Sequence, residues 1–148
     1  MICEFQNEYR FLSNFYPLQH PIQVESILYY TSENAFQAMK TLDKEARIQI
    51  SKVNPYKAKK LGRKVILRED WEDIKLNIME MVIYKKFRYT PLKELLLSTY
   101  PKKLIEGNGW NDTFWGVSNG VGSNNLGIIL MKVRDHFMIH DYFPICSP

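Results

Sequence analysis

The chain has 148 residues, of which 45% are hydrophobic and 24% are charged. A domain of this length buries about 68–70% of its unfolded surface, enough for a core without disulfides or metals. The composition excludes collagen-like, disulfide-rich and disordered chains, because Gly and Pro number only 7 each and aromatic residues make up 14%. We therefore expect one domain spanning residues 1–148.

Cysteine usage and the hydrophobic pattern indicate a reducing, aqueous setting. Cys3 and Cys146 lie far apart in the chain, so they form neither a CxxC pair nor a zinc cluster. The first residues lack a basic segment followed by an apolar one, and the apolar stretch 128–131 is too short to cross a bilayer. We expect a cytoplasmic protein with no membrane segment and no obligate protein partner.

Positive charge is concentrated in one segment, although the net charge is only +4. Residues 46–68 contain no acidic side chain and eight basic ones, namely Arg47, Lys52, Lys57, Lys59, Lys60, Arg63, Lys64 and Arg68. Such a segment attracts a phosphate-bearing substrate or nucleic acid. Alternatively, it is a solvated helix face balanced by acids elsewhere.

The first half of the chain predicts one strand and four helices. An aromatic loop at 11–17 precedes a strand at 22–30, which is rich in Ile, Val and Tyr. Capping residues predict helices from Thr31 or Ser32 to Leu42, from Asp43 to Val53, and from Asn54-Pro55 to about Lys64. Apolar spacings of three and four predict a long helix over 70–89.

The second half predicts fewer regular elements. Thr90-Pro91 starts a short helix, and residues 104–106 are typical of a short strand. A loop rich in Gly and Asn follows over 107–125, and its length suggests a function. A last helix runs from Leu126 to about Phe137. The predicted fold class is α+β, mainly helical with a small sheet.

A first polar cluster lies on the helix that begins near Ser32. At about 100° per residue, Glu33, Gln37 and Lys40 fall within an arc of about 60°, away from the apolar side of the helix. They are either ordinary helical pairs on a surface or a carboxylate and an amine in one cleft. In a cleft, Glu33 could act as acid or base and a desolvated Lys40 as a nucleophile.

A second cluster occupies residues 106–116, where Glu106 and Asp112 could orient water or hydroxyl groups. Trp110 or Trp115 could stack on a base, or could anchor the loop to the core. The turn before Asn125 opens a helix, whose free N–H groups favour a phosphate. His136 and His140 have the spacing of metal ligands but lack the rest of a zinc motif, so we expect no metal and no cofactor.

Five segments occur together in an order that resembles one protein family. They are FLSNFYP (11–17), TSENAFQAMK (31–40), NPYKAKKLGR (54–63), the DW of 70–71, and EGNGWNDTFWG with the following G.G.NNLG..LM..R (106–134). The chain is identified from them as a member of the NADAR, or YbiA-like, family over residues 9–137. The resemblance implies a compact, mainly helical α+β domain, N-glycosidase activity and no metal.

The resemblance also implies roles for particular residues. It places the main carboxylate at Glu33 and suggests Lys40 and Asp112 as further catalytic groups. Many relatives have His after the motif Glu, whereas this chain has Asn34, which cannot relay a proton. The predicted substrate-binding residues are Ser13, Asn14, Phe15, Asn34, Gln37, Arg63, Trp71, Glu106, Asn108, Trp110, Trp115, Gly116 and Asn125.

The family's chemistry leaves the substrate and the route open. Members resemble enzymes that release ADP-ribose from a nucleobase such as guanine, or that cleave ribosylamino-pyrimidine phosphates of riboflavin biosynthesis. The basic segment and the sequence pI of about 9.0 favour ADP-ribosylated DNA. The alternatives are the riboflavin intermediates and a module that only binds ADP-ribose or nucleic acid. Cleavage could use water activated by a carboxylate or a Schiff base at Lys40.

Overall fold

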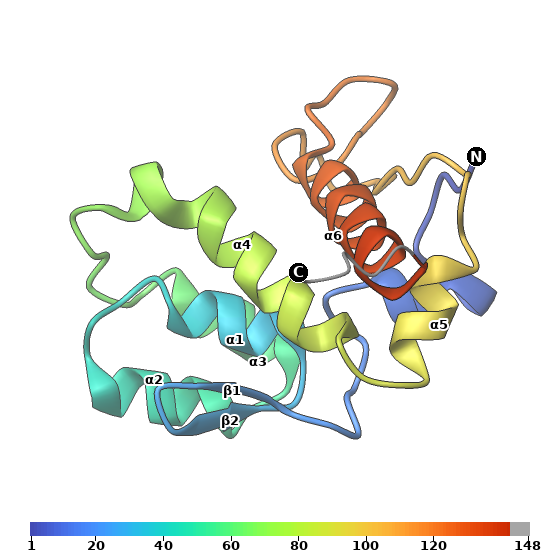
Figure 1. Ribbon diagram of the computed structural model, residues 1–148. Helices are drawn as coiled ribbons and strands as arrows, with labels where there is room; N and C mark the ends of the chain where they lie inside the picture. The colour runs from blue at the N-terminus through green and yellow to red at the C-terminus, as the bar shows by residue number, and fades with distance from the viewer. Residues whose placement is uncertain (143–148) are drawn as a thin grey trace. The chain divides into compact units, whose positions relative to one another are not determined.

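The computed structural model describes residues 1–142 (Figure 1). The chain divides into two compact units. One unit runs from Asn14 to Lys86, and the other combines Met1–Ser13 with the chain from Phe87 onward. Cys146 lies outside the described residues. Within residues 1–142, no helix has the length and apolar character needed to cross a membrane.

The unit of residues 14–86 begins with a hairpin instead of the single strand predicted over 22–30. β1 (Ile22–Val24) pairs antiparallel with β2 (Ile27–Tyr29). Glu25 and Ser26 connect the strands with φ angles of 48° and 67°, the left-handed conformation that a type I′ turn requires at both central positions. The prediction was wrong because such turns usually carry Asn-Gly, and Glu-Ser gives no comparable signal.

Three short helices follow the hairpin, and their predicted capping residues are confirmed. Thr31, Asp43 and Asn54 each accept a hydrogen bond from a backbone N–H of the following first turn. The helix α1 packs against the other two (Figure 1). The three helices are α1 (Ser32–Ala38), α2 (Lys44–Ser51) and α3 (Pro55–Gly62).

The helix α1 ends at Ala38, before the predicted end at Leu42. The carbonyl oxygen of Lys40 accepts a hydrogen bond from the backbone N–H of Arg68 at 2.8 Å. The next carbonyl oxygen, that of Thr41, accepts from the Arg47 side chain at 2.8 Å. The carbonyl oxygens of Lys40 and Thr41 thus bond to donors from other segments instead of the N–H groups of a further helical turn. The helix α1 therefore ends soon after Glu33 and Gln37. The long helix α4 (Trp71–Phe87) follows, as predicted.

The other unit contains η1 (Asn7–Leu12), α5 (Leu92–Leu97) and α6 (Asn125–Tyr142), and α5 contacts both of the others. The predicted strand at 104–106 is reduced to an isolated bridge between Ile2 and Leu104. The core of this unit includes the buried side chains of Leu96, Leu130 and Phe137. The prevalence of helices and the small antiparallel sheet confirm the predicted α+β class.

Candidate active site

Glu33 lies in the first turn of α1, where the helix cap and a neighbouring loop fix the backbone. Thr31 accepts a hydrogen bond from the Asn34 N–H at 3.0 Å. The Glu33 N–H donates to the carbonyl oxygen of Asn14 at 2.9 Å, and the Ser32 hydroxyl donates to Asn14 Oδ1 at 2.9 Å. Asn14, which was predicted to bind substrate, therefore holds the start of α1.

Glu33 and Gln37 form a buried pair on one face of α1. Gln37 Nε2 donates to Glu33 Oε1 at 2.6 Å across one helical turn. Only 7% of Glu33 and 4% of Gln37 are exposed, so the alternative of a solvated surface pair is wrong for these two residues. A carboxylate held in one orientation is suited to stabilise a developing positive charge or to activate water.

Lys40 follows α1 and is half-buried. Burial lowers the pKa of its amine, the nearby Glu33 carboxylate raises it, and three cations lower it again, namely Arg63, Lys59 and Lys75. The net pKa lies below the ordinary value of 10.5. A lowered pKa increases the neutral fraction of the amine, which is the form that attacks a carbonyl or imine carbon.

Two residues predicted to bind substrate are built into the packing of this unit. Asn34 Nδ2 donates to the carbonyl oxygens of Ile50 and Val53, each at 2.7 Å, and so joins α1 to the end of α2. Trp71 is buried, with its ring centre 5.1 Å from that of Phe36. Both residues thus stabilise the packing of this unit, and a substrate contact at either one stays a prediction.

The basic segment 46–68 does not form one continuous positive surface. Arg47 is buried and donates to Glu25 at 2.5 Å, which closes the β1–β2 turn onto α2. Arg68 forms an ion pair with Asp70 at 2.7 Å. These two cations are neutralised inside their own unit, so they add little to the attraction of an anionic partner.

The remaining basic residues around α3 fall into two groups. Lys59 and Arg63 act on the Lys40 amine, whereas Lys57 and Lys60 on α3, and Lys64 two residues beyond its end, are exposed. Tyr56 is 71% exposed, and the half-buried Phe15 holds its ring edge-on with the ring centres 4.7 Å apart. The exposed side of α3 thus combines positive charge with an aromatic ring.

In the other unit, the loop 104–125 is held by side chains that bond to its backbone. Asn124 Oδ1 accepts from the Glu106 N–H at 2.9 Å, and Asn124 Nδ2 donates to the carbonyl oxygen of Leu104 at 2.9 Å. Asn108 Nδ2 donates to Glu106 Oε2 at 3.1 Å. It also donates to the carbonyl oxygen of Asp112 at 2.8 Å. Glu106 and Asn108 are therefore brought together as part of an ordered loop.

Asp112 forms a local turn within the same loop. Its Oδ1 accepts from the backbone N–H groups of Phe114 at 3.2 Å and Trp115 at 2.9 Å. Trp115 is half-buried with its ring against that of Phe114, whereas Trp110 is 61% exposed. Trp110 therefore does not anchor the loop to the core, which leaves its ring available for stacking. Ser13, also in this unit, is half-buried at the end of η1.

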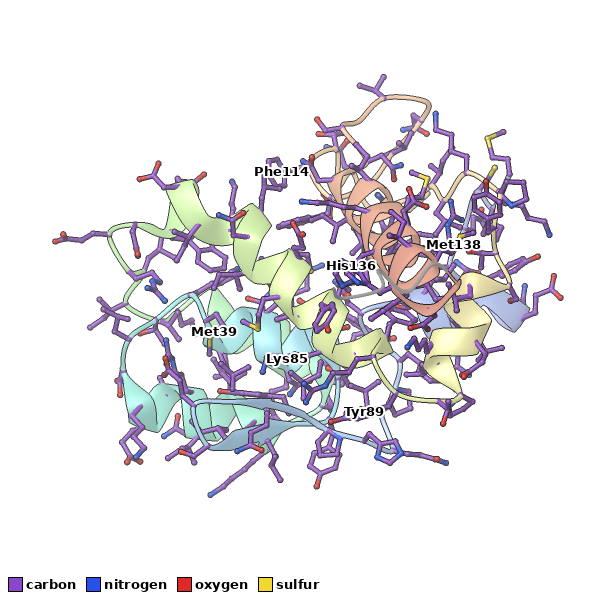
Figure 2. All side chains as sticks on the ribbon, in the orientation of Figure 1. Met39, Lys85, Tyr89, Phe114, His136 and Met138 are labelled. Atoms are coloured by element: carbon purple, nitrogen blue, oxygen red, sulfur yellow. The ribbon has the colours of Figure 1, made fainter. Side chains whose placement is uncertain are left out.

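The start of α6 does not offer the free N–H groups that we predicted would hold a phosphate. The backbone N–H and Nδ2 of Asn125 both donate to the carbonyl oxygen of Phe114, at 3.3 and 2.9 Å. The Leu126 N–H donates to the carbonyl oxygen of Trp115 at 2.9 Å. Figure 2 labels Phe114 on the loop that supplies these acceptors. The loop folds back and uses these donors of Asn125 and Leu126 itself, and a substrate contact at Asn125 stays a prediction.

Gly62 and Asn124 were not among the predicted site residues. A Cβ at Gly62 would overlap Gln37 Oε1 and lie 2.8 Å from Gln37 Cδ. A glycine inside a helical pattern often has a packing reason. The glycine in the LGR of the basic motif could therefore have been predicted to lie at a close contact between helices. Asn124 has a φ of 53°, and its side-chain bonds to Glu106 and Leu104 were not readable from spacing alone.

The structure also describes the two histidines considered as metal ligands. His136 and His140 lie on α6 with ring centres 4.2 Å apart, and Figure 2 labels His136. Within residues 1–142, no group of three or more His, Cys, Asp or Glu side chains is arranged to hold a metal ion.

The comparisons with known proteins agree with the fold and with the order of the motifs. The family model of the NADAR domain matches residues 3–138. The chain is 39% identical over 138 residues to the N-glycosidase YbiA of Shigella flexneri, covering 90% of this chain and 84% of that protein. It is 36% identical to a riboflavin biosynthesis protein of Vibrio vulnificus, over 88% of this chain and 36% of that protein.

A solved structure extends this similarity to three dimensions. The NMR structure of YbiA from Escherichia coli superposes with a TM-score of 0.84 at 36% sequence identity, covering 97% of this chain and 88% of that one. The family match, the identity to YbiA and the shared fold lead to one conclusion. The chain belongs to the NADAR family.

Proposed function

We propose that this protein is an N-glycosidase that hydrolyses the bond between ribose C1′ and a nucleobase nitrogen. The observation that carries the proposal is the buried Glu33–Gln37 pair, with the half-buried Lys40 following on the same segment. The names of the relatives support it, since YbiA is named an N-glycosidase and the Vibrio protein a riboflavin biosynthesis protein. Glu33 is the residue on which the activity depends most.

In a direct route, the C1′–N bond breaks and its electron pair leaves on the base, which takes up a proton. The sugar passes through a state with positive charge shared between C1′ and the ring oxygen. The Glu33 carboxylate stabilises that charge or accepts a proton from the attacking water. The water oxygen then bonds to C1′, and the products are the free base and a ribose with a C1′ hydroxyl group.

In a second route, Lys40 acts as the nucleophile. The base-linked ribose opens to an imine, the neutral Lys40 amine adds to C1′, and the base departs with a proton. Water then hydrolyses the new Schiff base, which restores the amine and releases the sugar. The lowered pKa of Lys40 favours this route. Reduction with borohydride during turnover separates the two routes, because only the second leaves the sugar attached to Lys40 in a mass spectrum.

The substrate that we favour is an ADP-ribosylated base, guanine in particular, in DNA. Support comes from α3, which exposes two lysines and the Tyr56 ring and is followed by the exposed Lys64, because basic residues next to an aromatic ring are typical of surfaces that bind nucleic acid. The second candidate is a ribosylamino-pyrimidine phosphate, and the name of the Vibrio relative favours it. Such a compact anion requires only one or two cations, a role open to Arg63 and Lys59.

The experiment that tests the function uses both substrate classes. The purified chain is incubated with ADP-ribosylated guanine DNA and, separately, with a ribosylamino-pyrimidine phosphate, and the released base is identified by mass spectrometry. We expect base release that depends on Glu33, with Glu33→Gln as the control. Tight binding of either compound without base release over a long incubation would contradict the enzyme and favour a binding module.

Salt dependence tests the choice of substrate. Charge reversal of Lys57, Lys60 and Lys64 should weaken binding to modified DNA and flatten the slope of log affinity against log salt, by roughly 0.9 for each duplex phosphate that the variant no longer binds. Cleavage of the small ribosyl phosphate serves as the control and should change little. Equal losses on both substrates would mean that these lysines shape the site itself. No loss on DNA would make them an ordinary solvated face.

A further inference from the structure

Gly62 lies at a point where α3 approaches α1 so closely that no other residue fits without movement. A Cβ at this position would overlap Gln37 Oε1 and come within 2.8 Å of Gln37 Cδ and 3.2 Å of Gln37 Cβ. All three atoms belong to the side chain that donates to Glu33. Gly62 is itself buried. The close approach therefore concerns one side chain, that of Gln37.

The backbone of α3 does not require glycine at this position. Gly62 is the last residue of the α-helix, and the positive φ angles that favour glycine occur elsewhere in residues 1–142. Glycine in a helix is less favourable than alanine. An alanine would therefore stabilise α3 unless a contact prevented it, and the contact present is the one with Gln37.

The orientation of the Gln37 amide follows from its surroundings. The carboxylate oxygen of Glu33 at 2.6 Å can accept a hydrogen bond and so must face the NH₂ group of the amide. The other end, Oε1, is buried at Gly62 without a hydrogen-bond partner in the described residues. An unpaired buried acceptor is unfavourable, because it has lost its hydrogen bonds to water. Oε1 of Gln37 therefore lies in an unfavourable environment, whereas Nε2 keeps its hydrogen bond to Glu33.

We propose that Gln37 is a positioning residue for the Glu33 carboxylate and that Gly62 provides the space that holds its amide in place. This inference rests on the proposed function, since it assigns Gln37 to act through Glu33 instead of touching the substrate. The side chain is 4% exposed, which agrees with an indirect role. Gly62 thus affects the activity, although its helix, α3, supplies no catalytic carboxylate.

The test is a double-mutant cycle of Gly62→Ala and Gln37→Ala. Gly62→Ala should lower kcat roughly 10–100-fold, the effect of a misplaced catalytic group, with little change in KM. The melting temperature should not fall, because the two nearest obstructing atoms belong to the amide at the end of a flexible side chain and alanine favours the helix. In the Gln37→Ala background the added methyl group meets no amide, so Gly62→Ala should have no further effect on kcat.

A spectroscopic measurement keeps the inference testable without turnover. The side-chain NH₂ signals of Gln37 in a ¹⁵N NMR spectrum report its hydrogen bond to Glu33, and Gly62→Ala should move them toward the values of a solvated amide. If the wild type releases no base but these signals move, the proposed function fails and the positioning contact stands. Unmoved signals, multiplicative losses in the cycle, or a melting temperature that falls in step with kcat would each overturn the inference.

Discussion

Glu33 on α1 and Glu106 in the loop 104–125 are both held by an amide side chain, yet different parts of the fold fix their positions. Glu33 accepts a hydrogen bond from Gln37 at 2.6 Å, and Glu106 accepts one from Asn108 at 3.1 Å. The first pair is spaced by one helical turn, whereas the second is spaced by two residues in a segment without regular structure. A similar local arrangement therefore arises in two ways.

The difference lies in what holds the backbone. Around Glu33, the hydrogen bonds of the helix and the Thr31 cap are sufficient, and the Glu33 side chain is not needed for them. In the loop, the side chains of Asn108, Asp112 and Asn124 are themselves the partners of backbone groups. A functional group can thus be removed from the helix at small cost in stability, whereas removal from the loop disturbs the fold.

The largest expected effect is that of Glu33→Gln. A positioned acid or base contributes about 10²–10⁴ in rate, so kcat for base release should fall by that factor. The new amide retains an oxygen that can accept from Gln37 Nε2, so the pair and the helix should persist. Activity assays and thermal unfolding of the same preparation measure the two expectations.

Two outcomes would contradict this view of the helix. Turnover close to that of the wild type would remove Glu33 from the reaction. A large fall in melting temperature would mean that the carboxylate is part of the fold, and the distinction between the two regions would then disappear.

The next effect is expected in the loop, on stability. A Cβ at Gly116 would overlap the side chain and the backbone carbonyl oxygen of Glu106, and a backbone atom cannot swing away. Gly116→Ala should cost about 3 kcal/mol, the upper end for overpacking. That cost lowers the melting temperature by about 2–4 °C per kcal/mol in a chain of this size. Gly109→Ala is the matched control, because a Cβ there meets nothing within 4 Å.

The difference between helix and loop also explains which parts of the structure could be predicted from the sequence. Helix caps such as Asn54 and the alignment of Glu33 with Gln37 depend on neighbours one turn away, so spacing was sufficient to find them. The turn at Glu25 and Ser26 could not be predicted because its residues are unusual for their conformation. The closeness of Gly62 to Gln37 depends on how two helices pack.

The loop resisted prediction for a related reason. Its composition indicated an ordered segment, and Glu106 and Asn108 do lie together. Which carbonyl oxygen each amide reaches depends on the path of the whole loop, as for Asn125 and the Phe114 oxygen. A free helix start was therefore a reasonable expectation from local pattern and was wrong in this fold.

A smaller effect on stability is expected for Asp112→Ala. The substitution removes the acceptor of two backbone N–H groups, and the loss of such a cap costs about 1–2 kcal/mol. Asp112→Asn keeps an oxygen at the same place and should unfold like the wild type. Turnover of Asp112→Asn then tests the predicted catalytic role, because only a role that needs the negative charge is lost. Unchanged turnover would remove Asp112 from the catalytic residues.

The smallest expected effect is a shift in pH dependence at the helical site. Burial lowers the pKa of Lys40, Glu33 raises it, and Arg63 is the first of the cations that lower it again. If the neutral amine is the nucleophile, kcat rises with pH through the pKa of Lys40. Arg63→Gln removes a lowering influence, so that pKa increases and the rising limb of the profile moves to higher pH. Arg63 is exposed, so added salt should reduce the difference between variant and wild type. A profile without a limb that rises with pH would contradict an amine nucleophile at Lys40 and favour direct attack by water at Glu33, whereas a limb that stays in place at low salt would mean that Arg63 does not lower this pKa.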